Sequence, residues 1–261
     1  MSMRFSVLGS GSKGNSIFIE SGDTAILIDA GFSGKEIAAR LALIGRHISC
    51  LKAVFVTHEH HDHIHGVGVM SRRCRIPVFA NEGTYRGAGT ALAKLHKRGE
   101  FETGDRTELN GLEIHSFAIS HDTADPVGFV VSDGRERLGV CTDTGIGSRL
   151  ISRRLSNCSG LVLEFNHDPD MLKNGPYPQA LKQRVKSSQG HLSNGDGADL
   201  LESVIHDQLR CVVLAHLSET NNLPEIAYRE AERVVLDKLD LSSLSVSEQQ
   251  IPTPLYDLNS S

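Results

Sequence analysis

Four side chains that commonly bind metal ions form a short run with the pattern H-x-H-x-D-H. They are His58, His60, Asp62 and His63, and they follow the apolar residues 53–56. Successive side chains of a strand point to opposite sides, so His58 and His60 share one side. Where the chain then bends into a loop, Asp62 and His63 can turn toward a second point nearby. Imidazole and carboxylate groups suit zinc-like ions. The pattern therefore predicts two adjacent metal sites rather than a histidine-rich surface loop.

This pattern after a hydrophobic strand resembles the signature of the metallo-β-lactamase superfamily. The resemblance implies a mixed α/β fold of the α+β type, namely a four-layer αββα sandwich with a binuclear metal site along one edge. It also implies a downstream His, a bridging Asp and a last His, which the sequence offers in that order as His121, Asp143 and His216. Asp29 resembles an early Asp of the family that supports the site by hydrogen bonding. The resemblance covers roughly residues 4–240.

The same resemblance divides seven ligands between two metal ions. The ligands of the first metal would be His58, His60 and His121. The ligands of the second metal would be Asp62, His63 and His216. Asp143 would bridge the two, and Zn²⁺ or Mn²⁺ would suit this set equally well. A bound dication can lower the pKa of water from 15.7 to roughly 7, so a bridging hydroxide oriented by Asp62 is the expected nucleophile.

A second cluster resembles elements of nucleic-acid-processing enzymes. Glu164 ends an apolar strand, and His191 precedes a predicted helix. The pair is similar to the Glu and His that assist phosphodiester cleavage in the transfer-RNA 3′-processing branch of the superfamily. The chain is more similar to the YycJ/WalJ group of single-domain exonuclease-like proteins, which are described as 5′-to-3′ exonucleases acting on DNA. The segments that carry this similarity are Ser10–Ser16, Glu164–Asp168, Gly190–Asn194 and His216–Asn222. Phe165 departs from the expected Ser. A catalytic role for Glu164 and His191 competes with a structural hydrogen bond.

The glycine-rich run Gly9–Gly14 matches the dinucleotide-binding pattern G-x-G-x-x-G. That fold would need a helix to open at the last glycine, whereas residues 15–20 have the pattern of a strand. We therefore expect a tight hairpin turn that brings the backbone close to the site. Ser10, Ser12 and Asn15 could then hydrogen-bond a phosphate group, and a turn with no ligand role is the alternative.

A basic segment is predicted to guide the backbone of a nucleic acid. It contains Lys173, Lys182, Arg184 and Lys186, and Tyr177 is available to stack on a base. If residues 179–186 form a short helix, Lys182 and Lys186 share one face because they are four positions apart. Arg184 then points elsewhere. The alternative is an ordinary solvated helix surface.

The composition is that of a globular protein without a membrane span. Hydrophobic residues make up 39% and charged residues 23% of the 261 positions, and no stretch approaches the ~20 apolar residues of a transmembrane helix. The five cysteines are odd in number and include no C-x-x-C, so reduced thiols and a cytoplasmic location are expected. The net charge of −5 argues against a surface that coats nucleic acid. It does not exclude a nuclease, because bound metals add local positive charge.

Alternating runs of strand-like and helix-like sequence indicate one domain. Strands are predicted at 4–8, 16–20, 24–29, 53–56, 77–80, 112–119, 127–132, 137–141, 160–164 and 210–215. Helices are predicted at 34–44, 66–73, 82–97, 147–155, 193–205 and 224–239. The interval between Asp143 and His216 leaves no room for an inserted domain. We expect one domain over residues 1–240, followed by a weakly ordered, serine-rich tail over residues 241–261.

Three classes of function are consistent with these patterns. The first is a metal-dependent phosphodiesterase, most simply a 5′-to-3′ DNA exonuclease, with an RNA-processing nuclease as a variant. The second is a thioester or lactone hydrolase acting on a small molecule. The third is a binding or scaffold protein with an inactive metal site, which the complete ligand set disfavours. The Glu164 cluster and the basic segment favour the first class. The sequence leaves cleavage polarity, DNA against RNA, and oligomeric state open.

Overall fold

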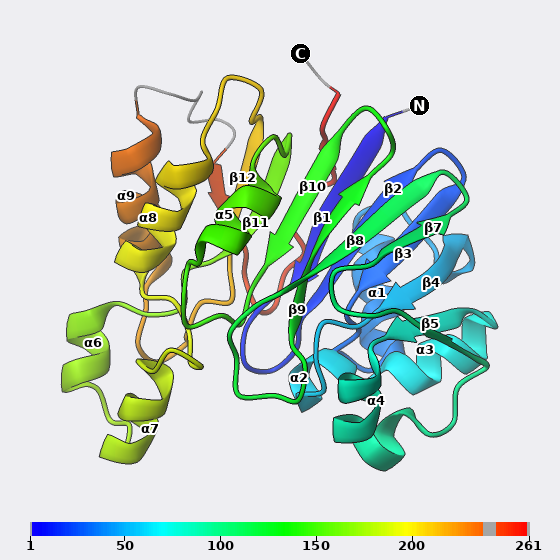
Figure 1. Cartoon of the computed structure of the whole chain (residues 1–261), viewed down its shortest axis with the longest axis horizontal. Coiled ribbons are helices and arrows are strands. Elements are labelled where there is room, and N and C mark those ends of the chain that lie inside the picture. Colours follow the sequence, from blue (N-terminus) through cyan, green and yellow to red (C-terminus); the bar gives the residue numbers. More distant parts are fainter. Residues whose placement is uncertain (1, 237–243, 260–261) are drawn as a thin grey trace.

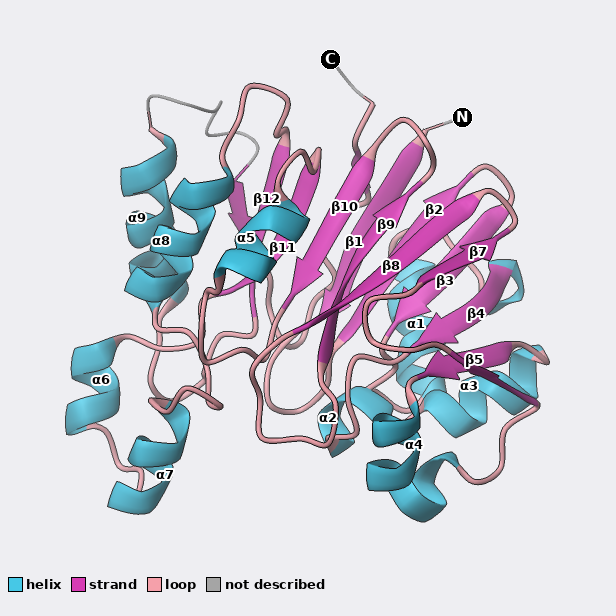
Figure 2. Cartoon of the chain, in the orientation of Figure 1, coloured by secondary structure: helices cyan, strands magenta, loops and turns pink. Residues whose placement is uncertain are grey.

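Two seven-stranded sheets pack face to face, and helices cover the outer face of each (Figures 1 and 2). The structure is a computed structural model that describes residues 2–236 and 244–259. This arrangement is the four-layer αββα sandwich that the sequence predicts, and all ten predicted strands are present. Within the described part of the chain, no helix has both the length and the apolar composition needed to cross a bilayer.

The elements divide into two similar halves. The first sheet has the order β14 (Tyr256–Asp257), β1 (Met3–Gly9), β2 (Ser16–Ser21), β3 (Thr24–Ile28), β4 (Leu51–Phe55), β5 (Pro77–Ala80) and β6 (Lys97–Glu100). The second has the order β13 (Leu244–Val246), β12 (Cys211–Ala215), β11 (Gly160–Glu164), β10 (Arg137–Cys141), β9 (Val127–Ser132), β8 (Leu112–Ala118) and β7 (Arg106–Leu109).

Helices flank the two sheets. The helices over the first sheet are α1 (Gly34–Leu43), α3 (Val67–Cys74) and α4 (Glu82–Ala88). Those over the second are α5 (Arg149–Leu155), α8 (Asn194–Val204) and α9 (Pro224–Val235). The remaining short helices are η1 (Ile48–Cys50), α2 (His61–Ile64), η2 (Gly89–Leu92), α6 (Pro169–Asn174) and α7 (Gln179–Val185).

Side-chain alternation explains why the central strands are apolar on both faces. In β3, Ile26 and Ile28 enter the core between the two sheets. The alternate residues Ala25 and Leu27 enter the core beneath the helices of the first sheet. The strands of the second sheet divide their side chains in the same way. Because both faces are covered, these strands are continuous apolar runs, as is usual for strands buried on both sides.

The carboxyl ends of the parallel strands meet at one end of the sandwich, at the bottom of Figure 1. Three residues just after the ends of these strands have a left-handed backbone conformation. Asp29, Asp143 and His216 each have φ of 59°. This conformation is uncommon outside glycine and costs of order 1–3 kcal/mol. It turns the chain sharply where these polar side chains leave the sheets, and so gathers them at one place.

One predicted helix is too long. The pattern over residues 82–97 predicted a single helix, but α4 ends at Ala88 and the chain continues as η2 and then as strand β6. Gly89 adopts φ of 52° at the C-cap of α4, a backbone conformation that glycine reaches more readily than other residues. The glycine content of this stretch was the signal for the early stop. Strands β6 and β7 were not predicted.

The C-terminal segment is part of the fold. Strand β13 pairs with β12 and strand β14 pairs with β1, so the segment completes one edge of each sheet. Leu258 is fully buried between the sheets. The predicted weakly ordered tail is therefore wrong for residues 244–259, while 241–243 and 260–261 lie outside the described residues. Serine-rich composition was misleading because backbone pairing and a few buried side chains hold this segment.

Candidate metal centre

The H-x-H-x-D-H run joins strand β4 to the short helix α2 and places its ligands in two groups. His58 and His60 lie in the extended loop after β4, whereas Asp62 and His63 lie in α2. Among the described residues, four overlapping groups of side chains offer ligand atoms that lie within 4.8 Å of one another; one is Asp143, Glu164, His191 and His216, one is His58, His63 and Asp143, and the other two match the ligand sets predicted for the two metals. Of these two sets, the first is His58, His60 and His121, and the second is Asp62, His63 and His216. We call them the first and second triad.

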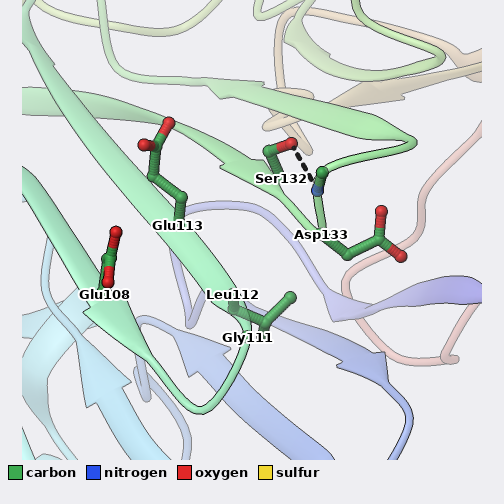
Figure 3. A pocket seen from close by; sticks show the side chains of 7 residues that line it. Glu108, Gly111, Leu112, Glu113, Ser132 and Asp133 are labelled. Atoms are coloured by element: carbon green, nitrogen blue, oxygen red, sulfur yellow. Dashed lines mark hydrogen bonds between the residues drawn. The ribbon is translucent and has the colours of Figure 1, made fainter.

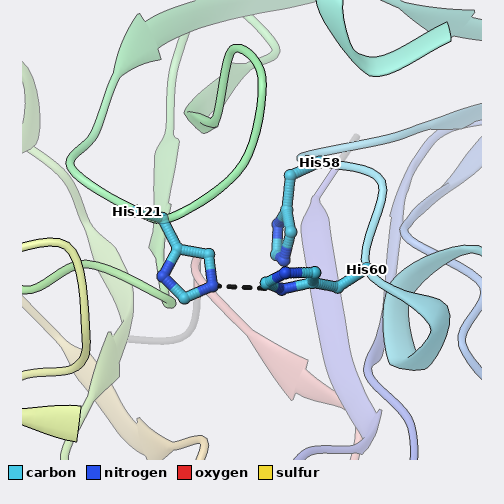
Figure 4. Close-up of side chains that lie close together, drawn as sticks. All are labelled: His58, His60 and His121. Atoms are coloured by element: carbon cyan, nitrogen blue, oxygen red, sulfur yellow. Dashed lines mark hydrogen bonds between the residues drawn. The ribbon is translucent and has the colours of Figure 1, made fainter. Parts of the chain in front are cut away.

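The rings of the first triad point toward a common centre (Figure 4). The Nε2 atom of His121 lies 3.2 Å from Nδ1 of His60. His58 is fully buried, and burial together with neighbouring imidazoles lowers its pKa well below the usual value. Its ring is therefore neutral, which is the form that binds metals.

Asp143 lies between the two triads. Its Oδ1 atom is 3.4 Å from His216 Nε2 and 3.9 Å from His121 Nε2, and its Oδ2 atom is 3.4 Å from His63 Nε2. Three buried ligand atoms here have no hydrogen-bond partner, namely His58 Nε2, Asp143 Oδ2 and His216 Nε2. Unpaired buried polar atoms are costly and rare. Their convergence fits bound cations.

The carboxylates give the centre an excess of negative charge. Burial opposes a charge on His63, but Asp143, Asp29 and Asp62 outweigh it and raise its pKa to about 9. Burial likewise opposes a charge on His216, yet Asp143 and Asp62 help to hold its pKa well above the usual value. In the metal-free chain, protons on these rings supply the positive charge that divalent ions would otherwise provide.

Further hydrogen bonds fix the orientation of the imidazoles. Asp29 accepts from Nδ1 of His63 at 2.8 Å and from the backbone and hydroxyl of Thr57, also at 2.8 Å. The Nδ1 atom of His121 lies 3.1 Å from the carbonyl oxygen of Gly190. A partner on Nδ1 leaves Nε2 free to face the centre. The predicted supporting role of Asp29 agrees with this geometry.

Glu164 is fully buried and accepts four hydrogen bonds. Oε1 accepts from Nδ1 of His191 at 2.8 Å and of His216 at 2.9 Å. Oε2 accepts from the backbone of Thr144 at 3.0 Å and of Leu192 at 3.1 Å. Although burial opposes ionisation, His191 and His216 hold the pKa of Glu164 below its usual range. The carboxylate thus holds one member of the second triad and the partly exposed His191 together.

The glycine-rich run forms the predicted hairpin turn, since strand β2 follows it. Ser10 and Asn15 are buried and engaged within the protein. The hydroxyl of Ser10 accepts from the backbone of His216 at 2.9 Å and donates to Asn15 at 2.9 Å. The amide of Asn15 donates to Asp62 at 3.1 Å. The expected phosphate contact of Ser10 and Asn15 is therefore corrected to a positioning role, whereas Ser12 is exposed beside the site.

An ion pair at the site, between Arg184 and Asp122, was not predicted from the sequence. Arg184 on α7 donates to Asp122, with its Nη2 3.1 Å from Oδ1. That same Oδ1 lies 3.6 Å from Nε2 of His121 and 3.8 Å from Nε2 of His60. Arg184 was expected to point away from the face shared by Lys182 and Lys186, and the structure pairs it with Asp122 beside the first triad. Asp122 was visible as the neighbour of His121, whereas nothing in the sequence connected it to Arg184.

The predicted basic segment forms α6, α7 and the loop between them, beyond the sheets near the site (Figure 1). Lys173 and Lys186 are exposed. The ammonium of Lys182 donates to the backbone oxygen of Lys173 at 2.7 Å, so it ties α7 to α6. Tyr177 and Ser12 line a cavity beside the second triad.

A different hollow lies at the far end of the sandwich, where the β7–β8 and β9–β10 turns meet (Figure 3). Its lining includes Glu108, Glu113 and Asp133. Carboxylates repel a phosphate backbone, so this hollow is not suited to nucleic acid.

The chain is similar to known proteins over most of its length. The family model described as "Beta-lactamase superfamily domain" matches residues 24–216. An exodeoxyribonuclease YycJ from Bacillus anthracis is 36% identical over 240 residues, which cover 91% of each chain. An exodeoxyribonuclease WalJ from Streptococcus pneumoniae is 38% identical over 229 residues, covering 86% of this chain and 85% of that one. The crystal structure of the metallo-β-lactamase fold protein YhfI from Bacillus subtilis aligns with a TM-score of 0.75 at 16% identity, over 97% of this chain and 99% of that one.

Proposed function

This chain belongs to the β-lactamase superfamily, and from that premise we propose that it is an exodeoxyribonuclease that uses two divalent metal ions. It is a metal-dependent hydrolase. The finer proposal is supported by two metal-ligand triads with Asp143 lying between them. The chain that carries them is 36% and 38% identical, over most of its length, to proteins named exodeoxyribonucleases.

Each triad would hold one metal ion, and Asp143 would contact both. The unpaired buried atoms of His58, Asp143 and His216 support this assignment. Divalent ions held by these residues would polarise a phosphodiester and lower the pKa of bound water to roughly 7. Imidazole and carboxylate ligands suit either Zn²⁺ or Mn²⁺.

His191 would donate the proton that the leaving oxygen requires. Its Nδ1 atom is engaged with Glu164, which leaves Nε2 available to the substrate. Its side chain is 17% exposed, whereas Glu164 is completely buried. Glu164 would therefore act on the reaction through His191 and His216. General acid assistance of this kind is typically worth 10²–10⁴-fold in rate. Asp62 would hold the second metal and help to orient the attacking water.

Nucleic acid would approach past α6 and α7. The ammonium groups of Lys173, Lys182 and Lys186 would attract phosphates, and Tyr177 and Ser12 would contact the substrate near the metals. Cleavage from the 5′ end, and DNA as the substrate, are proposed from the similarity to the exonuclease group. A cytoplasmic location likewise stays a prediction from the cysteine content.

End-labelled nucleic acids test this function directly. Purified protein with Mn²⁺ or Zn²⁺ would be given single- and double-stranded DNA and RNA with a 5′-phosphate or a 5′-hydroxyl. We expect mononucleotides to be released first from the 5′ end of DNA. Release from the 3′ end would contradict the polarity. Intact nucleic acids together with hydrolysis of a thioester or lactone would contradict the whole proposal, and preferential cleavage of RNA would contradict the choice of DNA.

A further inference from the structure

An arginine beside the metal centre has no role in the function proposed above. Arg184 lies near the end of α7 and pairs with Asp122, the residue after His121. The Oδ1 atom of Asp122 lies 3.6 Å from Nε2 of His121 and 3.8 Å from Nε2 of His60. No other arginine within the described part of the chain is paired with a carboxylate so close to a triad histidine. The pair is therefore a feature of the metal centre.

Asp122 occupies only one edge of the guanidinium group of Arg184. Its Oδ2 atom accepts from Nε, and its Oδ1 atom accepts from Nη2 at 3.1 Å. An arginine carries five N–H donors in a rigid planar fork, and this pair uses two of them. Nη1 has no hydrogen-bond partner among the described residues. The pair thus fixes the guanidinium and leaves its outer edge, formed by Nη1 and Nη2, available to a ligand.

The same side chain also adjoins the second triad. Arg184 lines a cavity of about 160 Å³ to which His191 and His216 also contribute. His216 is a member of the second triad, and His191 is the proposed proton donor. The side chain of Arg184 is 53% exposed, so its free edge can be reached from solution. Arg184 is therefore fixed beside the first triad through Asp122 and lines a cavity next to the second.

The chemistry of this free edge favours one class of ligand. A guanidinium group stays charged at every pH at which proteins are folded, and two of its parallel N–H groups match two oxygens of a phosphate. A thioester or a lactone offers an uncharged carbonyl group and no such pair of anionic oxygens. The edge is thus suited to an anionic phosphate that has reached the triads.

We propose that Arg184 binds the phosphate group that is cleaved and that Asp122 is its positioning residue, which rests on the proposed exodeoxyribonuclease function. Nη1 and Nη2 donate to two non-bridging oxygens of the phosphate, while Asp122 keeps the long arginine side chain from turning away. Arg184 thereby selects anionic phosphodiesters over uncharged esters. This role differs from that of Lys182 and Lys186, which share another face of the helix and attract phosphates that are not cleaved.

Binding of inorganic phosphate tests the subsite without relying on turnover. The Zn²⁺-loaded full chain is titrated with phosphate by calorimetry, and its metal content is measured in parallel. Arg184→Ala should weaken phosphate binding roughly 10- to 100-fold and keep both metals. The kcat/KM for bis-p-nitrophenyl phosphate should fall by a similar factor. Arg184→Lys should restore little, because an ammonium paired with Asp122 has no second rigid edge.

The matched control is Arg106→Ala. It removes another exposed arginine, which pairs with Glu113 at 3.2 Å on the edge strand β7. This variant should bind phosphate and hydrolyse the small diester as the wild type does. An equal loss of phosphate affinity in Arg106→Ala would show that the effect is one of overall charge, and would overturn the subsite.

A double-mutant cycle tests the positioning role of Asp122. Asp122→Ala should weaken phosphate binding in the wild type, because the released arginine loses its fixed orientation. The same change should cause no further loss in Arg184→Ala, since Asp122 acts through the arginine. An equal loss in both backgrounds, or tighter binding in Asp122→Ala alone, would overturn this role.

The outcomes separate the subsite from the overall function. Undiminished phosphate binding in Arg184→Ala, or loss of a metal ion from that variant, would overturn the subsite even if DNA is degraded. Phosphate binding that depends on Arg184, in a protein that degrades no DNA, would support the subsite and overturn the exodeoxyribonuclease proposal.

Discussion

Glu164→Gln should selectively weaken the second metal. The four donors around this carboxylate require two accepting oxygens, and glutamine offers one. If the amide oxygen of the glutamine accepts from the backbone N–H groups of Thr144 and Leu192, the amide NH₂ group faces the Nδ1 atoms of His191 and His216. Those rings must then carry their protons on Nε2, which prevents His216 from binding a metal. Each hydrogen bond lost to a charged group is worth about 1.5–3 kcal/mol, and such changes typically cost 10–100-fold in metal affinity.

The measurement is a titration of the metal-free variant with Zn²⁺ against a competing chelator. We expect the affinity of one site to fall 10- to 100-fold while the other is retained, because the first triad does not contact Glu164. Glu113→Gln, at the opposite end of the sandwich, is the matched control. His191→Ala should keep both metals and lower turnover by about 10²–10⁴-fold. Two unchanged metal affinities in Glu164→Gln would refute the positioning role of this carboxylate.

Three further results are expected from the same structure. Leu258→Ala should lower the free energy of unfolding by about 2–5 kcal/mol in chemical denaturation, because this side chain is fully buried between the sheets; an unchanged value would contradict the fold of the C-terminal segment. Changing Lys182 and Lys186 together to Glu should weaken DNA binding at low salt, and each lost phosphate contact should reduce the salt slope by about 0.7–0.9, while cleavage of bis-p-nitrophenyl phosphate is retained. Since the pKa of His63 is raised from 6.5 to about 9 in the metal-free chain, its stabilising charge is fully present below pH 6.5 and lost as pH rises through about 9. The proton also competes with the metal, so apparent metal affinity should increase with pH up to about 9, and a pH-independent affinity would contradict this.

The central strands and the proposed ligands could be predicted because they depend on local sequence. Apolar runs with both faces buried marked the strands, and the ligands stand at or just after the ends of such runs. His121, Asp143 and His216 were found in this way together with the resemblance to a family. The resemblance implied that these residues, which are far apart in sequence, belong to one site, and the structure brings their side chains together at one edge of the sandwich.

Other features depend on contacts between distant segments. Ser10 and Asn15 were expected to face a phosphate, and only the packing of the turn against Asp62 and His216 shows that their hydrogen bonds are satisfied internally. Arg184 and Asp122 are 62 positions apart, and no local pattern relates them. The C-terminal strands are short, and their pairing with β1 and β12 could not be inferred from a serine-rich composition.

The positions of the metal ions test the central claim most directly. Crystals of the protein grown with Mn²⁺ or Zn²⁺ would be measured at the absorption edge of the metal, so that anomalous scattering locates each ion. Two peaks are predicted, one within the triad of His58, His60 and His121 and one within the triad of Asp62, His63 and His216. Their separation should be about 3.5–4 Å, with Asp143 in contact with both. A single peak, or two peaks that do not share Asp143, would contradict the binuclear centre.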